Sequence, residues 1–475
     1  MKLIKNGTVL TAESEFKGDI LIDGETIMAV GKNLDQLADD MIDASGKYIF
    51  PGGVDEHTHF GSFGGRLFET TEAAAVGGTT TIVDFVPQEK GDSLGTAVEK
   101  HAAKASGISC VDFGFHSMVM DMQPDTPDQI KELPKHGVSC VKMFMAYKGT
   151  PFFMEDISIL KVMNESKRHG ITMMVHAENP DMISFYTERL KAEGYLAPVN
   201  HSYSRPPITE EDAVRHAISM AQVADVPLFI VHVSTKGAME AVREAYAGGQ
   251  SVFGETCTHY LVLDTSYLAL PDFEGAKYVC APPLRTKEHQ EALWEGIDRG
   301  WLNAVSSDHC ALVGGFEKKK EGLEDFTKIP NGIPGVQNRI SVLWSQGVAK
   351  GRISKQRFVD LIATTPAKNA GLANKGQIAP GFDADLVIYD PDYRGIITQK
   401  DNLEGIGYET FEGFEMTGRP EQVFLRGMLV AENGRFIGSR GCGHRIYAKP
   451  YAAAYKHYRP ALWAQKYPYL FFNAL

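Results

Sequence analysis

Eight short apolar runs alternate with helical stretches through the middle of the chain, and this alternation limits the fold more than any other feature. Repeated strand–helix units of this kind build a parallel sheet. Eight units over about 250 residues are what a (β/α)8 barrel requires. The runs are GGVDEHTHF from Gly52, TTTIVDF from Thr79, VDFGFHS from Val111, SCVKMFM from Ser139, TMMVHAE from Thr172, LFIVHVS from Leu228, SVFGETC from Ser251 and NAVSSDH from Asn303.

The segments between the runs support this α/β reading. SLGTAVEKHAAKA, EEDAVRHAISMAQVA and TKGAMEAVREAYAGG carry apolar residues at helical spacing. The alternative is a doubly wound open sheet, but no G-x-G-x-x-G follows the first run. Polar side chains also end several different runs, whereas an open sheet gathers them at one switch point. We therefore expect a TIM-like barrel.

Short strands with turn signals bracket this central region. They are KLIKNGTVLT and GDILIDGETIMAVG near the start, and ADLVIYDP and QVFLRGMLVAENGRFIG near the end. Asp23-Gly24 and Asn433-Gly434 are two-residue hairpin signals. From Gly441 the chain is rich in Tyr, Trp and Phe without a clear period. Aromatic residues at that density suggest packing on the body or on another subunit.

Charge and cysteine content exclude several classes of function. The chain holds 48 basic and 60 acidic residues, a net charge of -12, which argues against nucleic acid as a partner. We interpret the basic cluster Lys318–Lys320, which Glu321 follows, as a solvated surface. The six cysteines form no CxxC pair, so neither a zinc ribbon nor a disulfide framework is indicated, and we expect a cytoplasmic protein. The sequence shows neither a signal-peptide pattern nor a run of about 18 apolar residues, so we expect no contact with a membrane.

Histidines and one aspartate close four of the eight runs. His57 and His59 lie two residues apart at the end of the first, so both face the same side and can share a metal. His176 ends the fifth run and His232 the sixth. Each alone is more often a core histidine, but four at one level of a barrel indicate a metal site. Asp308 ends the eighth run, where a carboxylate can ligate metal and exchange a proton with water.

Lys142 lies in the middle of the fourth run, among Val141, Met143, Phe144 and Met145. A buried lysine without a partner has a lowered pKa, and its neutral amine could take up carbon dioxide as a carbamate that bridges two metals. The residues alone leave this open against a lysine that reaches solvent. Lys148 is a rival beyond the apolar run. With the carbamate, the donors suit two zinc-like ions bridged by hydroxide, which is a hydrolytic site.

Taken together, PGGVDEHTHF, GGTTTIVDF, VKMFMAYK, MVHAEN, IVHVS, APPLR, SSDHC, IPNGIPG and PGFDADLVIYDP closely resemble the dihydropyrimidinase and hydantoinase family of cyclic amidohydrolases. The resemblance implies two zinc ions per subunit, for which manganese and cobalt would also suit the ligands. It implies that His57, His59 and Asp308 hold one ion, that His176 and His232 hold the other, and that carboxylated Lys142, rather than Lys148, bridges them.

The same resemblance assigns the remaining site residues. Tyr147 matches the tyrosine that steadies the tetrahedral intermediate, and main-chain groups at Ala281 and Asn331 match positions that hold the imide ring. Asp308 would take the proton from the bridging water and pass it to the departing nitrogen. The implied reaction opens a dihydropyrimidine or 5-substituted hydantoin to the N-carbamoyl amino acid, in a homotetramer. The implied domains are a β-sandwich from 1–50 and 373–440, a catalytic barrel over 51–372 and an aromatic tail over 441–475.

The chain departs from the family pattern in the substrate region. Ala281 stands where a serine is common, and the stretch GSFGGRLFE after His59 looks shorter than in most members. Loops after barrel strands shape the pocket, so the ring substituent stays open. One hypothesis is that four phenylalanines line it, although phenylalanine is more often plain core. They are Phe60, Phe63, Phe152 and Phe153. His116 also ends a run, but the family gives it no ligand role, and we interpret it as structural.

Two alternatives belong to other groups of proteins. Dihydropyrimidinase-like cytoskeletal regulators share the fold without the metal site, but here all six matching positions are filled. Dihydroorotase and allantoinase use the same metal cage on differently charged rings, and acidic substrates generally need a basic residue in the pocket. Arg66 and Arg285 keep that alternative open.

Overall fold

The computed structural model describes residues 1–63, 65 and 68–456. Its centre is an eight-stranded parallel sheet in the order β15-β14-β13-β12-β11-β10-β9-β8. A parallel bridge between Thr58 and His309 joins the first strand to the segment after the last, which closes the sheet into a barrel. The strands are β8 (Gly53–Thr58), β9 (Thr79–Pro87), β10 (Asp112–Met118), β11 (Val138–Phe144), β12 (Thr172–His176), β13 (Leu228–Ile230), β14 (Val252–Cys257) and β15 (Ala304–Ser306). All eight predicted runs are barrel strands, so the predicted fold is confirmed.

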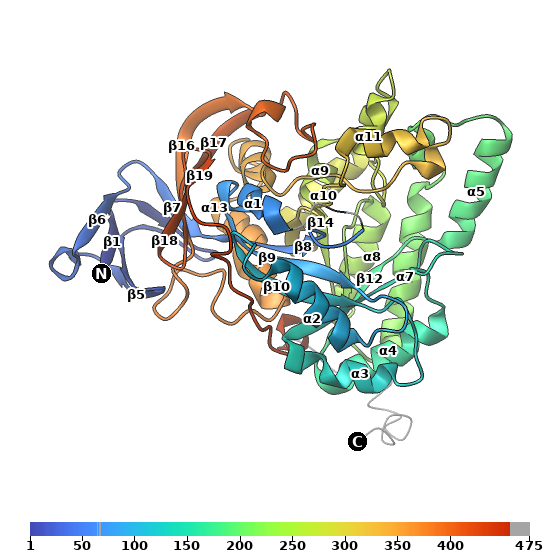
Figure 1. The fold of residues 1–475 in the computed structure, drawn as a ribbon, viewed down its shortest axis with the longest axis horizontal. Helices are drawn as coiled ribbons and strands as arrows, with labels where there is room; N and C mark the ends of the chain where they lie inside the picture. The colour runs from blue at the N-terminus through green and yellow to red at the C-terminus, as the bar shows by residue number, and fades with distance from the viewer. Residues whose placement is uncertain (64, 66–67, 457–475) are drawn as a thin grey trace.

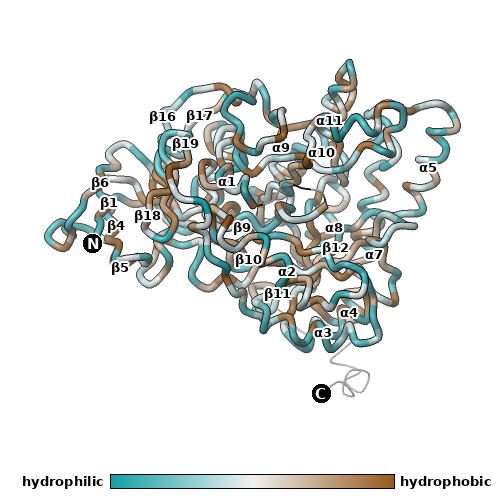
Figure 2. Tube along the Cα trace, in the orientation of Figure 1, coloured by the Kyte–Doolittle hydropathy of each residue, from teal (hydrophilic) through white to brown (hydrophobic). Residues whose placement is uncertain are grey.

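Helices surround this barrel on its outer side (Figure 1). Two of the three predicted helices begin at a capping side chain: the Ser93 hydroxyl accepts from Thr96 N in α2, and the Thr235 hydroxyl accepts from Ala238 N in α8. Figure 2 shows apolar segments along β9 and β18, whereas the peripheral loops are mainly hydrophilic. The longer helices are α2 (Leu94–Ala105), α3 (Thr126–Glu132), α4 (Asp156–His169), α5 (Pro180–Ala192), α7 (Pro207–Ala224), α8 (Lys236–Ala247) and α10 (Lys287–Asp298). The shorter ones are α1 (Glu72–Val76), α6 (Asn200–Tyr203), α9 (Thr258–Val262), α11 (Gly315–Lys319), α12 (Arg339–Leu343), α13 (Lys355–Val359), α14 (Thr365–Asn369) and α15 (Ala453–Lys456).

Two further sheets come from the two ends of the chain and share one apolar core that includes Ile20 and Phe424. One has the order β5-β4-β1-β6 and the other β19-β18-β17-β16-β7-β2-β3, so N-terminal β7 pairs directly with C-terminal β16. They lie beside the barrel (Figure 1). The domain boundaries given above stay a prediction. The strands are β1 (Lys2–Lys5), β2 (Thr8–Leu10), β3 (Glu15–Lys17), β4 (Asp19–Asp23), β5 (Thr26–Gly31), β6 (Asp40–Asp43), β7 (Tyr48–Pro51), β16 (Leu386–Ile396), β17 (Glu415–Leu425), β18 (Met428–Glu432) and β19 (Arg435–Phe436).

Both hairpin signals lie at hairpins, but one differs in register. Asn433-Gly434 connects β18 to β19, and both residues have a positive φ, of 49° and 77°. In the first hairpin Asp23 pairs with Thr26, so the two loop residues are Gly24 and Glu25. The turn is one residue later than the Asp-Gly dipeptide predicts, because Asp23 still belongs to the ladder.

The described part of the aromatic tail, residues 441–456, packs against the barrel. Main-chain hydrogen bonds join Phe113 N to His444 O (3.0 Å) and Ile446 N to Phe113 O (2.8 Å). Further along, Tyr451 N donates to Gly170 O (2.7 Å), just before β12. This part of the tail therefore packs on the body, which is one of the two positions that the sequence predicted. Its subunit contact stays a prediction, and 457–475 lie outside the described residues.

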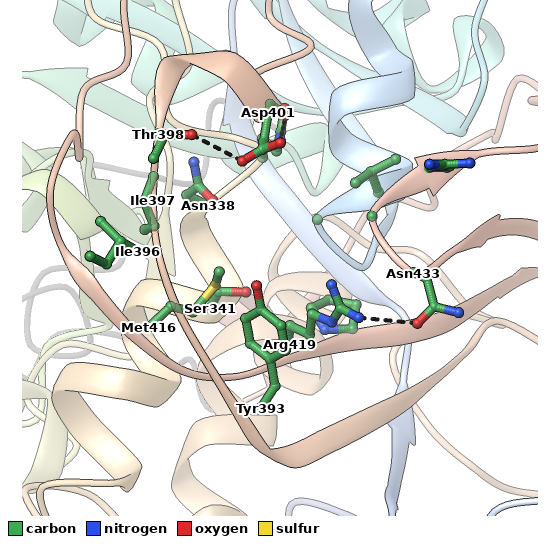
Figure 3. A pocket seen from close by; sticks show the side chains of 16 residues that line it. Asn338, Ser341, Tyr393, Ile396, Ile397, Thr398, Asp401, Met416, Arg419 and Asn433 are labelled. Atoms are coloured by element: carbon green, nitrogen blue, oxygen red, sulfur yellow. Dashed lines mark hydrogen bonds between the residues drawn. The ribbon is translucent and has the colours of Figure 1, made fainter.

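A cavity of about 340 Å³ lies between the C-terminal strands and the start of α12 (Figure 3). The Arg419 guanidinium lies 4.1 Å from the centre of the Tyr393 ring and donates to Asn433 Oδ1 (3.2 Å). None of the described residues that line it is a histidine or cysteine. The predicted chemistry therefore belongs elsewhere. Within the described part of the chain, no helix is long and apolar enough to cross a membrane.

Candidate metal centre

Three donor side chains predicted at the ends of two runs meet at the carboxyl end of the barrel. Nε2 of His57 lies 3.2 Å from Asp308 Oδ1, and Nε2 of His59 lies 3.4 Å from the same oxygen. Their ligand atoms all lie within 4.8 Å of one another, which suits a single metal ion. His57 and His59 come from β8 and the residue after it, and Asp308 follows β15. Because the barrel is closed, its first strand β8 lies beside its last strand β15, and this brings the histidines and the aspartate together.

Lys142, His176 and His232 lie beside this group. Nζ of Lys142 is 3.0 Å from Nε2 of His57, and the side chain is only 1% exposed. The ring centroids of His176 and His232 lie 4.5 Å apart, and those of His57 and His232 lie 5.3 Å apart. All six predicted metal ligands therefore surround one point at the end of the barrel.

Three of the site residues have a left-handed backbone. The φ angle is 65° at Tyr147, 41° at His232 and 48° at Asp308. Such a conformation costs on the order of 1 kcal/mol or more for a residue with a side chain and persists where the surroundings enforce it. The chain turns sharply at these points, just beyond β11, β13 and β15, and presents the side chains to the cavity.

Burial keeps the His59 and His232 imidazoles in the neutral form that metal ions bind. It lowers the pKa of His59 to about 4 and that of His232 well below its usual value. Burial also lowers the pKa of Lys142 to about 8, so an appreciable fraction is a neutral amine near neutral pH. For Asp308 burial alone would raise the pKa, but the neighbouring imidazoles outweigh it and hold the pKa well below the usual range. For His57 burial alone would lower the pKa, but the Asp308 and Glu255 carboxylates outweigh it and raise the pKa above its usual value. The donor atoms fit divalent metal ions in kind and position.

Two buried carboxylates that the sequence reasoning missed orient the histidines. Glu255 in β14 binds Nδ1 of His57 and also accepts from the Ser306 hydroxyl. Glu178 Oε2 lies 2.9 Å from Nε2 of His176 and accepts from Arg205 (2.9 Å). Carboxylates in this position fix the tautomer and direction of a ligating ring. The available signal was an acidic residue inside or directly after an apolar run, in SVFGETC and MMVHAE.

The predicted substrate residues line the same cavity as the donors. Tyr147, Ala281 and Asn331 face it, and Oδ1 of Asn331 is buried with no hydrogen-bond partner among the described residues. Burial raises the pKa of Tyr147, so its hydroxyl keeps its proton and can donate. The other described residues that line the cavity are two phenylalanines, two cysteines and one glycine: Phe63, Phe144, Cys280, Cys310 and Gly332.

The four phenylalanines of the sequence hypothesis have different positions. Phe63 lines the cavity and contacts Phe152 behind it, with ring centroids 5.3 Å apart. Phe60 is fully buried against His309, at 4.5 Å between rings, and is core. Phe153 is not among the lining residues and pairs with the backbone of Phe144.

Lys148, Arg285 and His116 each contact a partner outside the donor group. Lys148 is exposed and pairs with Asp181 (2.7 Å). Arg285 is buried against Glu210 (3.1 Å) and does not line the cavity, and Arg66 lies outside the described residues. Nε2 of His116 lies 3.1 Å from the Glu56 carbonyl oxygen, which is a structural contact.

One interpretation of the sequence is wrong. In the Lys318–Lys320 cluster the first and last side chains are exposed, but Lys319 is fully buried. Its amine donates to three carbonyl oxygens instead of reaching water. Helical geometry turns the middle side chain inward while its neighbours point out.

Comparison with known proteins agrees with this geometry. A model of the amidohydrolase family matches residues 48–430. The chain belongs to this family. It is 44% identical over 464 residues to a D-hydantoinase of Geobacillus stearothermophilus, covering 95% of this chain and 97% of that protein. The crystal structure of a dihydropyrimidinase from Brevibacillus agri superposes with a TM-score of 0.92 at 41% identity, covering 95% and 99% of the two chains. An L-hydantoinase from Arthrobacter aurescens is more distant, at 28% identity and a TM-score of 0.86, covering 94% and 99%.

Proposed function

We propose that this amidohydrolase opens the ring of 5-substituted D-hydantoins, and of dihydropyrimidines, to the N-carbamoyl amino acid. The observation that carries the proposal is the His57–His59–Asp308 donor group, of which His59 and Asp308 line one cavity together with Tyr147. Relatives named D-hydantoinase and dihydropyrimidinase, alike over nearly the whole chain, support the substrate class. The lower identity to the L-hydantoinase favours the D series.

We further propose that the cavity holds two zinc ions, one on His57, His59 and Asp308 and the other on His176 and His232. Such ions lower the pKa of a bound water and polarise the scissile carbonyl. Lys142 would bridge them after its neutral amine forms an N–C bond to carbon dioxide and releases a proton. This modification removes a cation that otherwise lies 3.0 Å from an imidazole and supplies two carboxylate oxygens.

The chain's own groups then have separate roles. Asp308 is held ionised, so it can accept the proton of the attacking water and return it to the departing ring nitrogen. Tyr147 keeps its proton and donates to the oxygen on which negative charge develops. Main-chain groups of Ala281 and Asn331 hold the ring against the cavity wall.

The lining favours a neutral ring over an acidic one. Lys142 is the only lysine or arginine among the described residues that line the cavity, and it is assigned to the metals. Arg285 forms an ion pair with Glu210 and does not line the cavity. A dihydroorotase-like substrate would leave its carboxylate without a cationic partner at these residues. A non-catalytic assembly role is not favoured, because every donor of the metal group is present and buried or nearly so.

Assembly and location complete the proposal. We propose a homotetramer, to which the aromatic tail contributes. We also propose a cytoplasmic location. The six cysteines all lie in the described part of the chain, where they are buried and unpaired, which suits a reducing compartment.

The deciding experiment measures ring opening by the zinc-loaded protein on five substrates side by side. They are dihydrouracil, D- and L-forms of an aryl hydantoin, allantoin and dihydroorotate. We expect turnover of dihydrouracil or the D-hydantoin to exceed that of dihydroorotate at least a hundredfold. Equal or faster opening of dihydroorotate would refute the neutral-ring proposal. Metal content near zero after purification with zinc would refute the metal centre.

A further inference from the structure

Lys319 is the last residue of α11 and one of the largest fully buried side chains in the molecule. No carboxylate among the described residues forms an ion pair with it. Instead, Nζ donates to the carbonyl oxygens of Val279 (2.9 Å), Pro330 (2.7 Å) and Gly332 (2.7 Å). Three donors thus meet three acceptors, so the ammonium group is satisfied without a counter-ion.

These three carbonyls belong to the two segments that carry the proposed ring-binding positions. Val279 lies two residues before Ala281, and Pro330 and Gly332 flank Asn331. The segments also touch each other, because Gly332 N donates to Val279 O (3.1 Å). Nε2 of His201 lies 2.8 Å from the Cys280 carbonyl oxygen, which fixes the first segment from another side.

We propose that Lys319 is a positioning residue, which clamps the Val279–Ala281 and Pro330–Gly332 segments into one wall for the substrate ring. The role in binding the substrate ring rests on the proposed function, whereas the clamping of the two segments does not depend on it. A donor on the Pro330 carbonyl also polarises the peptide whose N–H belongs to Asn331, and that makes the N–H a stronger donor. Lys319 acts through main chain alone and touches neither substrate nor metal ligand.

Burial lowers the pKa of Lys319 to about 8, although the nearby Cys310 and Cys280 act in the opposite direction. No other described lysine of the cluster can replace it. Lys318 pairs with Glu321 (2.6 Å) and Lys320 with Glu317 (2.5 Å), both at the surface.

The test compares Lys319→Met, which keeps length but removes all three donors, with the surface control Lys320→Met. In the zinc-loaded protein we expect Lys319→Met to raise KM for the best substrate at least tenfold, with a smaller change in kcat and unchanged metal content. Hydrogen exchange should accelerate at 279–281 and 330–333 and nowhere else. Lys320→Met should match the parent chain in every reading.

A second variant disturbs the Pro330–Gly332 segment directly, and it is used if Lys319→Met does not fold. A Cβ at Gly332, where φ is 119°, would lie 2.8 Å from Cys310 Sγ and 2.9 Å from its Cβ, so Gly332→Ala must shift the Gly332 backbone or the Cys310 side chain. We expect the same rise in KM with metal retained. Unchanged exchange and KM, or loss of metal in proportion to activity, would overturn the clamp. No ring opening by the parent chain would refute the proposed function, and the exchange measurement would still decide the clamp.

Discussion

Glu255 binds Nδ1 of His57, and this contact directs Nε2 of the same ring toward Asp308, 3.2 Å away. The imidazole is therefore fixed between two carboxylates from β14 and from the end of β15. A ligand held in this way binds metal without first losing rotational freedom.

Glu255→Gln should weaken zinc binding about 10- to 100-fold, because the amide cannot orient the His57 ring as an ionised carboxylate does. The measurement is competition with a chelator of known affinity. Glu56→Gln is the matched control. Burial raises the pKa of Glu56 well above its usual value, which favours the neutral carboxyl, so the neutral amide should leave zinc affinity unchanged. Equal losses in both variants would contradict the orienting role.

Lys142→Ala should reduce kcat/KM by at least about 10³-fold, because it removes the proposed bridge between the two metal ions. Millimolar acetate or propionate together with zinc should restore part of the activity, since the carbamate acts as a carboxylate. Lys148→Ala, at the exposed rival position, should retain parental rates. Full activity of Lys142→Ala without added acid would show that this lysine is not the bridge.

Tyr147→Phe should lower kcat about 10²- to 10³-fold, because it removes the proposed oxyanion donor. Zinc content should stay that of the parent, because the ring does not ligate metal. Steady-state kinetics with metal analysis on the same sample make the measurement. A proportional loss of zinc would reassign Tyr147 to the structure of the metal centre.

Glu409 predicts a pH dependence of stability away from the site. Burial, with the nearby Glu404 charge, raises its pKa from 4.5 to about 7. Between these pH values the folded protein keeps a proton that the unfolded chain releases, so the free energy of unfolding falls as pH rises from about 4.5 to 7. Glu409→Gln should remove part of that fall, by up to about 3 kcal/mol. Melting temperatures of the parent chain and of Glu409→Gln, measured over a series of pH values, test this prediction. Parallel curves for the two proteins would show that Glu409 is not the source of the pH dependence.

The barrel and the donors were accessible to sequence reasoning because both depend on local pattern. Each apolar run formed a strand, and side chains at the carboxyl ends of parallel strands converge whatever the loops do. The first hairpin differed by one residue, because the pairing of Asp23 with Thr26 depends on the partner strand rather than on the dipeptide.

Features that depend on distant segments were missed. Lys319 meets carbonyls 11, 13 and 40 residues away, and nothing in a run of three lysines marks which one turns inward. Glu255 reaches a histidine 198 residues away, so its role appears only once the barrel closes. The sorting of Phe60 into the core and Phe63 into the cavity likewise depends on how the loop after β8 folds.

The pairing of β7 with β16 has a consequence for how the protein is made. Strand β7 leaves the ribosome early and runs directly into β8, which carries His57, yet its partner is synthesised more than 300 residues later. During translation β7 can already pair with β2, but its other edge must wait, with its ladder groups unpaired, until β16 emerges. A polypeptide released before β16 could not complete this lobe, so truncated products should be marked for degradation by their own exposed edge.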